Sequence, residues 1–179
     1  MARKTKISFN VVTINWSYGS VCDFLIRASK GCVFFVDWGN GKATKHIGQE
    51  EVMQLQHNYN PRVMIPKEEI VYHIKILSED ENCLFTLLDV SHYEMRFSDI
   101  DVSRCTELEV LTCKWNGITT LDLRKNEALQ VLDCEYNGLT NLLLGNCSKL
   151  KEVHCIEGNK LKEPMKRWIE RLIAAQNTK

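Results

Sequence analysis

The stretch Leu108–Ile118, with the sequence LEVLTCKWNGI, returns as LQVLDCEYNGL at Leu129–Leu139, 21 residues later. A third copy opens with the same kinds of residue, at Leu150, Val153, Cys155 and Leu161. A fixed period of about 20 to 50 residues is typical of architectures in which each repeat stacks on its neighbours. The second half of the chain is therefore expected to form a solenoid of short parallel strands.

The period extends backwards from Leu108. The segment Ile100–Val102 aligns with Leu121–Leu123 and with Leu142–Leu144. One step earlier, five residues align with Leu108, Leu111, Cys113, Asn116 and Ile118, namely Leu87, Val90, His92, Met95 and Phe97. Terminal repeats are usually atypical because they cap the stack. We therefore expect a degenerate first repeat and a stack of fewer than four rungs.

The pattern LxxLxCxxNxLxxLDLxxN resembles the leucine-rich repeat over about 75 residues. The resemblance implies that Leu111-Thr112-Cys113 is a short parallel strand on the concave side. It also implies that Asn116 and Asn137 turn inward at the bends. A buried amide side chain carries both donors and an acceptor, so it satisfies backbone groups that a tight bend leaves unpaired. Asn126 is predicted to do the same at the opposite bend.

The first 80 residues lack the period and read as short strands. Strands are expected over five segments, at residues 7–14, 21–26, 32–38, 42–47 and 69–77. Residues 52–59 fit either a strand or a short helix. Asn40-Gly41 between two of these segments indicates a hairpin with a type I′ turn, in which both central residues have positive φ. Several short strands with regular turn signals favour a small β-sandwich.

A second resemblance lies in this region. The motifs Trp38-Gly39-Asn40-Gly41, His57-Asn58-Tyr59 and Tyr72–Ile76 resemble the WGDG…HxY…YxIxI pattern of PKD-like β-sandwich domains. Bacterial proteins of largely unknown role join such a domain to cysteine-containing repeats of this type, commonly on the cell surface. The resemblance therefore implies a bacterial two-domain protein with a surface or secreted location.

The sequence as a whole predicts a mostly β protein in three parts. Residues 1–82 form the PKD-like sandwich, residues 83–162 the leucine-rich-repeat solenoid, and residues 163–179 a C-terminal capping helix and tail. The apolar residues of that helix follow the spacing of one helical face, at Met165, Trp168, Ile169, Leu172 and Ile173. The same face could instead bind a partner protein.

Composition limits the classes of partner. The chain has 23 basic and 23 acidic residues, so its net charge gives no argument for a nucleic-acid or anionic-membrane partner. No stretch approaches the ~20 apolar residues that span a bilayer. The opening residues lack the apolar core of a signal peptide, which predicts an intracellular protein if Met1 is the native start.

Five of the eight cysteines fall at repeat positions and are interpreted as core residues. Cys113, Cys134 and Cys155 occupy one repeat position, and Cys105 and Cys147 share another. Small apolar residues are needed there, which favours free buried thiols over disulfides. Together with His92 the column could be taken for a metal site. Stacked rungs lie in a line about 4.8 Å apart, however, whereas zinc needs four ligands converging at about 2.0–2.3 Å. We therefore predict neither a metal nor a cofactor.

No catalytic constellation is visible. His46, His57 and His73 have no spacing that pairs them with a nucleophile or a carboxylate. Asp122 lies between two leucines that are expected to point inward, so it is expected to face solvent. The glycines around Asn40 form a turn rather than a phosphate-binding loop, because no helix follows. The protein is predicted not to be an enzyme.

The outward side of the concave strands is the best candidate for a binding site. If Leu111 and Cys113 point inward, alternation turns Thr112 and Lys114 outward, with Trp115 beside them. The predicted binding residues are Trp115, Tyr136, Tyr93, Lys114, Asp133 and Glu135, and Ser91 is expected to match Thr112 in the first rung. Exposed aromatic residues among charges are typical of protein-binding hot spots. The predicted function is recognition of a protein or glycan; the alternative is a structural or adhesive spacer.

Overall fold

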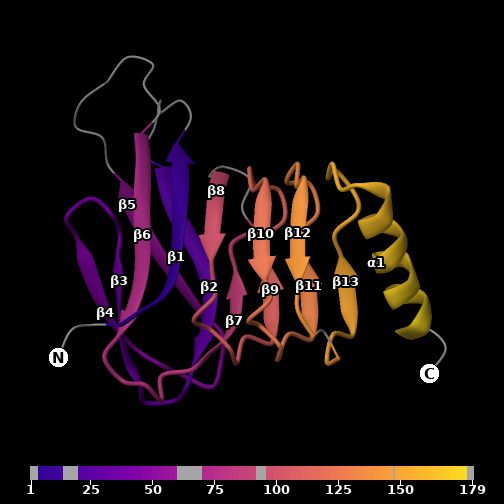
Figure 1. Ribbon diagram of the computed structural model, residues 1–179. Coiled ribbons are helices and arrows are strands. Elements are labelled where there is room, and N and C mark those ends of the chain that lie inside the picture. Colours follow the sequence, from indigo (N-terminus) through magenta and orange to yellow (C-terminus); the bar gives the residue numbers. More distant parts are fainter. Residues whose placement is uncertain (1–3, 14–19, 60–69, 92–95, 147, 177–179) are drawn as a thin grey trace.

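The protein is mostly β, with one helix at its C-terminal end (Figure 1). The computed structural model describes residues 4–13, 20–59, 70–91, 96–146 and 148–176. The strands of the first half are β1 (Lys4–Thr13), β2 (Ser20–Ala28), β3 (Val33–Asp37), β4 (Ala43–Ile47), β5 (Met53–Tyr59) and β6 (Ile70–Ser78). Those of the second half are β7 (Phe85–Asp89), β8 (Arg96–Asp101), β9 (Val110–Thr112), β10 (Thr120–Leu123), β11 (Val131–Asp133), β12 (Asn141–Leu144) and β13 (Glu152–His154), followed by helix α1 (Glu163–Gln176).

The six-stranded sheet runs through both halves of the chain. Its order is β13-β11-β9-β7-β2-β5, so strands of the 21-residue period continue directly into strands of the first half. A five-stranded sheet has the order β4-β3-β6-β1-β8, and its last strand contacts the separate pair β10-β12. Hydrogen bonding therefore crosses residue 83, where the sequence predicts a domain boundary, and Figure 1 shows the strands side by side as far as α1.

One hydrophobic core lies between these sheets. Phe34 of β3 meets Phe85 of β7 edge to face, with ring centroids 5.4 Å apart. Phe24 of β2 packs against Trp38, with centroids 5.7 Å apart. Alternate side chains along each strand point inward, so these contacts join the five-stranded to the six-stranded sheet. The same cluster of buried side chains continues to Ile169 on α1.

The predicted parallel strands are present, but the first copy is two residues out of the predicted alignment. Leu88, rather than Val90, pairs with Leu111. Phe97 keeps its predicted place, because its N–H bonds to the Asn116 side chain as the N–H of Ile118 bonds to Asn137. The first copy thus has two more residues between its strand and Phe97 than the next copy has between its strand and Ile118. An alignment at a constant spacing of 21 residues therefore places the first strand two residues too late in the sequence. His92 and Met95 lie outside the described residues.

The predicted hairpin is confirmed, but its turn type is wrong. β3 and β4 pair antiparallel as expected. Positive φ is found at Gly39 (76°) and Gly41 (78°), on either side of Asn40, rather than at Asn40 itself. The turn is longer than two residues, since the N–H of Trp38 bonds to the carbonyl of Lys42. The flanking glycines take the left-handed positions at no steric cost. The ambiguous segment at residues 52–59 is a strand, β5.

The prediction of free thiols holds for the column and is wrong for one pair of cysteines outside the repeat. Cys113, Cys134 and Cys155 are buried and free, as is Cys105. Cys32 and Cys83, in contrast, form a disulfide between residues 51 positions apart. Neither belongs to the repeat, and the two segments come together through the pairing of β2 with β7 and the hydrogen bonds between Ser29 and Leu84. Spacing along the chain therefore carries no sign of this pair. Cys147 lies outside the described residues.

Helix α1 packs its apolar side against the end of the core beside β13. Ile169 is fully buried, and Met165, Leu172 and Ile173 are partly buried. Trp168, which the helical spacing assigned to the same face, is 40 % exposed because it lies at the margin of the contact. Within the described part of the chain, no helix combines the length and the apolar character needed to cross a bilayer.

Candidate functional site

Trp115 and Tyr136 form a parallel aromatic stack on adjacent rungs. Their ring centroids are 3.9 Å apart and the ring planes differ by 2°. The two side chains are 41 % and 40 % exposed. Both residues have positive φ, 60° and 54°, a conformation that costs a residue with a Cβ about 1–2 kcal/mol. The sequence predicted this pair, and the structure brings it together.

Buried asparagines hold the bends that impose this conformation. The Asn116 amide donates to the carbonyls of Val90, Cys113 and Lys114, at 2.9–3.1 Å. Asn137 repeats the arrangement one rung later with Cys113, Cys134 and Glu135. The inward role of these amides is confirmed. They donate to carbonyls at a tight bend, so the aromatic residue just before each asparagine is fixed in place.

Gly158 occupies the left-handed position in the next rung, with φ 67°. A Cβ built on Gly158 would lie 2.5 Å from Cδ1 of Tyr136, which shows that the Gly158 backbone lies against that ring. Tyr136 is therefore stacked on Trp115 with one ring face, and the Gly158 backbone lies against the root of its ring.

Two rows of side chains cross the outer face of the six-stranded sheet, the side away from the core. In the first row the strand register aligns Asp89, Thr112, Asp133 and His154. In the second row the next outward residues follow, at Ser91, Lys114 and Glu135, whereas Ile156 at the corresponding position packs against the core. The structure thus corrects the predicted place of Ser91, because Asp89 matches Thr112 and Ser91 matches Lys114. The cause is the two-residue difference in the first copy.

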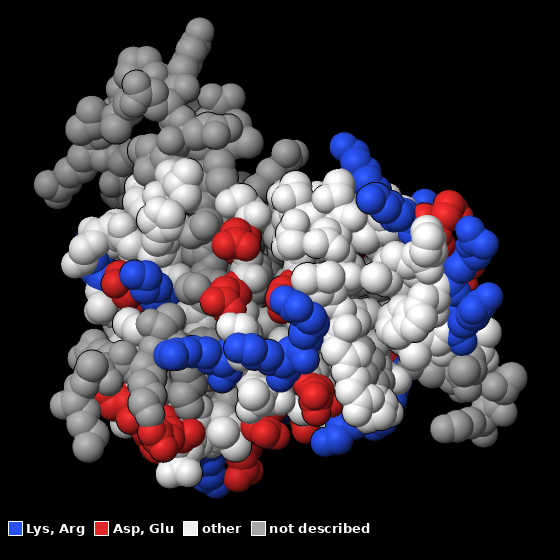
Figure 2. All heavy atoms as spheres, in the orientation of Figure 1, with Lys and Arg blue, Asp and Glu red and all other residues white. Residues whose placement is uncertain are grey.

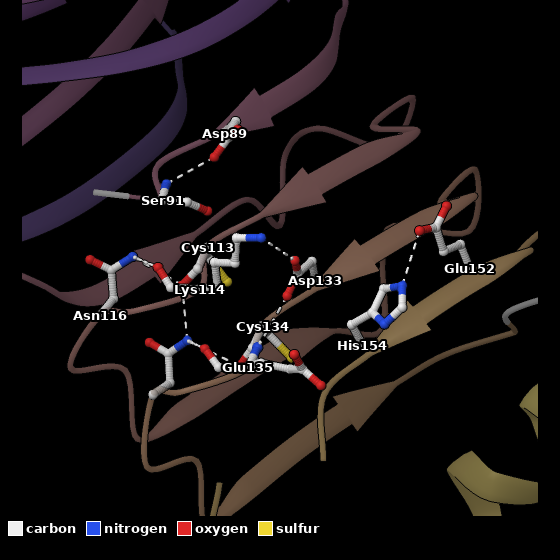
Figure 3. A network of polar contacts seen from close by, with 11 residues as sticks. Asp89, Ser91, Cys113, Lys114, Asn116, Asp133, Cys134, Glu135, Glu152 and His154 are labelled. Carbon is white, nitrogen blue, oxygen red and sulfur yellow. Dashed lines mark hydrogen bonds and ion pairs between the residues drawn. The ribbon is translucent and has the colours of Figure 1, made fainter. Parts of the chain in front are cut away.

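Polar contacts tie these rows together (Figure 3). Lys114 Nζ lies 3.1 Å from Asp133 Oδ2, and Asp133 is the more buried of the two, with 15 % of its side chain exposed. Asp89 Oδ1 accepts the N–H of Ser91 at 2.9 Å. The predicted residues Lys114, Asp133 and Glu135 therefore share one surface with the aromatic stack. Tyr93, also predicted here, lies outside the described residues.

The sequence interpretation missed an apolar row on the same face. Leu87, Val110 and Val131 are in register, and each is half-buried. They flank the inward Leu88, Leu111 and Leu132 and so point to the outer face. The alternation that assigned Thr112 outward assigns Val110 outward as well, so the signal was present in the sequence.

The histidines of the first half have structural partners. His57 stacks on Trp38 with centroids 4.9 Å apart, and its Nε2 lies 3.0 Å from the Asn40 amide. His46 stacks on Phe34. Burial lowers the pKa of both imidazoles, and Lys42 adds to the effect at His57. Both rings are thus held neutral against aromatic partners, which is a packing role.

The remaining candidates for catalytic or metal-binding residues are either buried in the core or exposed to solvent without a functional partner group. Burial raises the pKa of the Cys113 thiol, an effect that opposes the thiolate a nucleophile needs. Asp122 is exposed as predicted and lies 2.7 Å from Arg124, whose hydrogen bonds lower the pKa of that carboxyl to about 2. Among the described residues, no group of three or more His, Cys, Asp or Glu is placed to hold a metal ion. On the face shown in Figure 2, basic and acidic residues are interspersed.

No protein-family model, curated protein or solved structure matches this chain. The assignment of a function therefore depends on the geometry of the outer face.

Proposed function

We propose that this chain is a non-catalytic binding module, and that its partner is a protein that contacts the outer face at Trp115 and Tyr136. We further propose that its repeats are a leucine-rich-repeat solenoid joined to a PKD-like β-sandwich. The observation that carries the functional proposal is the exposed, parallel stack of these two side chains. Aromatic residues dominate binding hot spots because they bury a large area with few rotatable bonds.

The geometry of the stack favours a protein over a glycan. Sugar rings bind aromatic side chains by lying flat on an open ring face. Trp115 and Tyr136 each have one face covered by the other ring, and the Gly158 backbone lies against the root of the Tyr136 ring. Ring edges and their polar groups suit apolar side chains and carbonyl groups of a polypeptide.

The site is also fixed before a partner arrives. Positive φ at both residues is imposed by the asparagine bends, and each ring restrains the other. Little side-chain freedom then remains to be lost on binding, and that loss would otherwise weaken association by about 0.5–1.5 kcal/mol per side chain. The surface is small, since neighbouring rungs lie about 4.8 Å apart. A few residues must therefore supply most of the affinity.

The test is a capture experiment in which Trp115 and Tyr136 are replaced by glycine. Glycine is preferable to alanine because it is the natural residue in the left-handed position of the next rung, at Gly158. Trp168→Ala is the matched control, since Trp168 is exposed to the same degree but lies on α1. The immobilised protein is exposed to an extract of the organism that encodes it.

The expected result is a partner retained by the native protein and by the Trp168→Ala variant, and lost from the double glycine variant. Circular dichroism must show that all three proteins are folded. Equal capture by the double glycine variant would contradict the proposal. If the folded native protein captures nothing, the spacer function is favoured instead.

A further inference from the structure

The outer face of the six-stranded sheet is acidic although the chain as a whole is neutral. Five carboxylates lie at the outward positions of its strands and in the second row described above, at Asp23, Asp89, Asp133, Glu135 and Glu152. The same positions carry only two residues with a fixed positive charge, Arg27 and Lys114. We infer that the partner presents a cationic segment, with lysine or arginine side chains beside apolar ones, to this face. The inference rests on the proposed function.

Two of these carboxylates have no cationic partner among the residues that the structure describes. Asp133 has the ammonium group of Lys114 at 3.1 Å, and Glu152 has the His154 imidazole at 3.0 Å. In the part of the chain that the structure describes, no cationic group lies within 4.0 Å of the carboxylates of Asp89 or Glu135. These two charges therefore remain for a partner to pair with.

The apolar row beside these charges indicates that the partner segment also carries apolar side chains. Leu87, Val110 and Val131 lie in register on three neighbouring strands. Leu25 on β2 continues the row diagonally, because Arg27 pairs with Leu87 and Leu25 with Asp89, and it is 36 % exposed. Four strands about 4.8 Å apart give a row about 15 Å long, which an extended segment crosses in about five residues. Apolar side chains on such a segment would cover the row while its basic side chains reach the carboxylates.

Charge also argues against other occupants. An anionic partner such as a nucleic acid would face these carboxylates directly, and like charges brought together across an interface are strongly unfavourable. A second copy of the chain is disfavoured for the same reason. A two-fold dimer joins the same patch on both subunits, so Asp89 and Glu135 would meet their own equivalents.

The experiment is a selection from a phage-displayed library of random twelve-residue peptides on the immobilised full chain, followed by titration of the selected peptides. The test variant is Asp89→Asn with Glu135→Gln, in which the asparagine keeps an oxygen to accept the Ser91 N–H. The matched control is Glu107→Gln with Glu127→Gln, which removes two charges from exposed positions outside this face.

The selected peptides are expected to carry a net positive charge and to alternate basic with apolar residues. Their affinity is expected to fall about tenfold in the test variant and to stay unchanged in the control, with a further loss as salt rises. Neutral or acidic consensus peptides, unchanged affinity in the test variant, or recovery of no peptide would each overturn the inference.

Titration of the same peptides against the double glycine variant of Trp115 and Tyr136 distinguishes failure of this inference from failure of the proposed function. Peptides that bind without the two carboxylates but need Trp115 and Tyr136 would overturn the cationic partner and leave the proposed function standing. Peptides that need the carboxylates but not the aromatic pair would support the cationic partner and contradict the role of the stack.

Discussion

Replacing Asn137 by alanine is the sharpest test of how the repeat is held together. Its amide nitrogen lies within hydrogen-bond distance of three carbonyls, which share its two N–H groups, and its Oδ1 accepts a further bond from the N–H of Ile118. The alanine variant loses all of these contacts. The three carbonyls and the Ile118 N–H are affected differently by this loss, and the difference determines how far the free energy of unfolding is expected to fall.

The three carbonyls keep another donor. The Cys113 carbonyl still accepts from Asn116, the Cys134 carbonyl from Asn159, and the Glu135 carbonyl from the N–H of Trp115. Losing these three bonds costs about 2 kcal/mol together, because each retained partner removes the desolvation penalty. The N–H of Ile118 is left buried without an acceptor, which adds about 1–3 kcal/mol. We expect a total of about 4 kcal/mol, a large part of the usual 5–15 kcal/mol stability of a domain.

A series of asparagine variants makes the estimate testable. Asn126 is also buried, and among the described residues its side chain makes two bonds, to the carbonyls of Val102 and Cys105, so its alanine variant should lose about 2 kcal/mol. Asn141 is exposed on β12 and should change by less than about 0.5 kcal/mol. Urea denaturation at constant m gives the free energies of unfolding. A loss below 1 kcal/mol for Asn137→Ala, or a larger loss for Asn126→Ala, would refute the reasoning.

Three further predictions concern stability. Gly158→Ala is expected to cost more than Gly138→Ala in thermal unfolding, because both have positive φ but only at Gly158 would the new Cβ lie 2.7 Å from the Cα of Tyr136; equal losses would show that the contact relaxes freely. Cys32→Ser removes a cross-link spanning 51 residues and should lower the free energy of unfolding by up to about 4 kcal/mol, an effect that disappears when both proteins are compared under dithiothreitol. The pKa of His57 is lowered in the folded state, so the unfolded state binds its proton first and stability should fall as pH drops below about 6.5; His57→Gln should flatten that dependence in denaturation at several pH values, and an unchanged slope would contradict it.

The repeat was predictable because its signal is local. The leucines, the inward asparagines and the aromatic pair follow from one spacing, and a rung needs only its neighbours to form. What joins the first half to the repeat was not predictable in this way. The pairing of β2 with β7 and the disulfide between Cys32 and Cys83 depend on residues far apart in sequence. Neither contact produces a periodic pattern in the sequence.

The two-residue difference in the first copy changes the chemistry of the site as well as its alignment. Taken from the period alone, the outward residue matching Thr112 is Ser91, a neutral hydroxyl. The register matches Asp89 to Thr112 instead, two strands away from Asp133 in the same row. A carboxylate therefore begins the row at the strand where the repeat meets β2. Because Lys114 pairs with Asp133, the charge of Asp89 remains available. The acidic character of the outer face thus follows from the irregular first repeat, and the same irregularity joins that face to the first half of the chain.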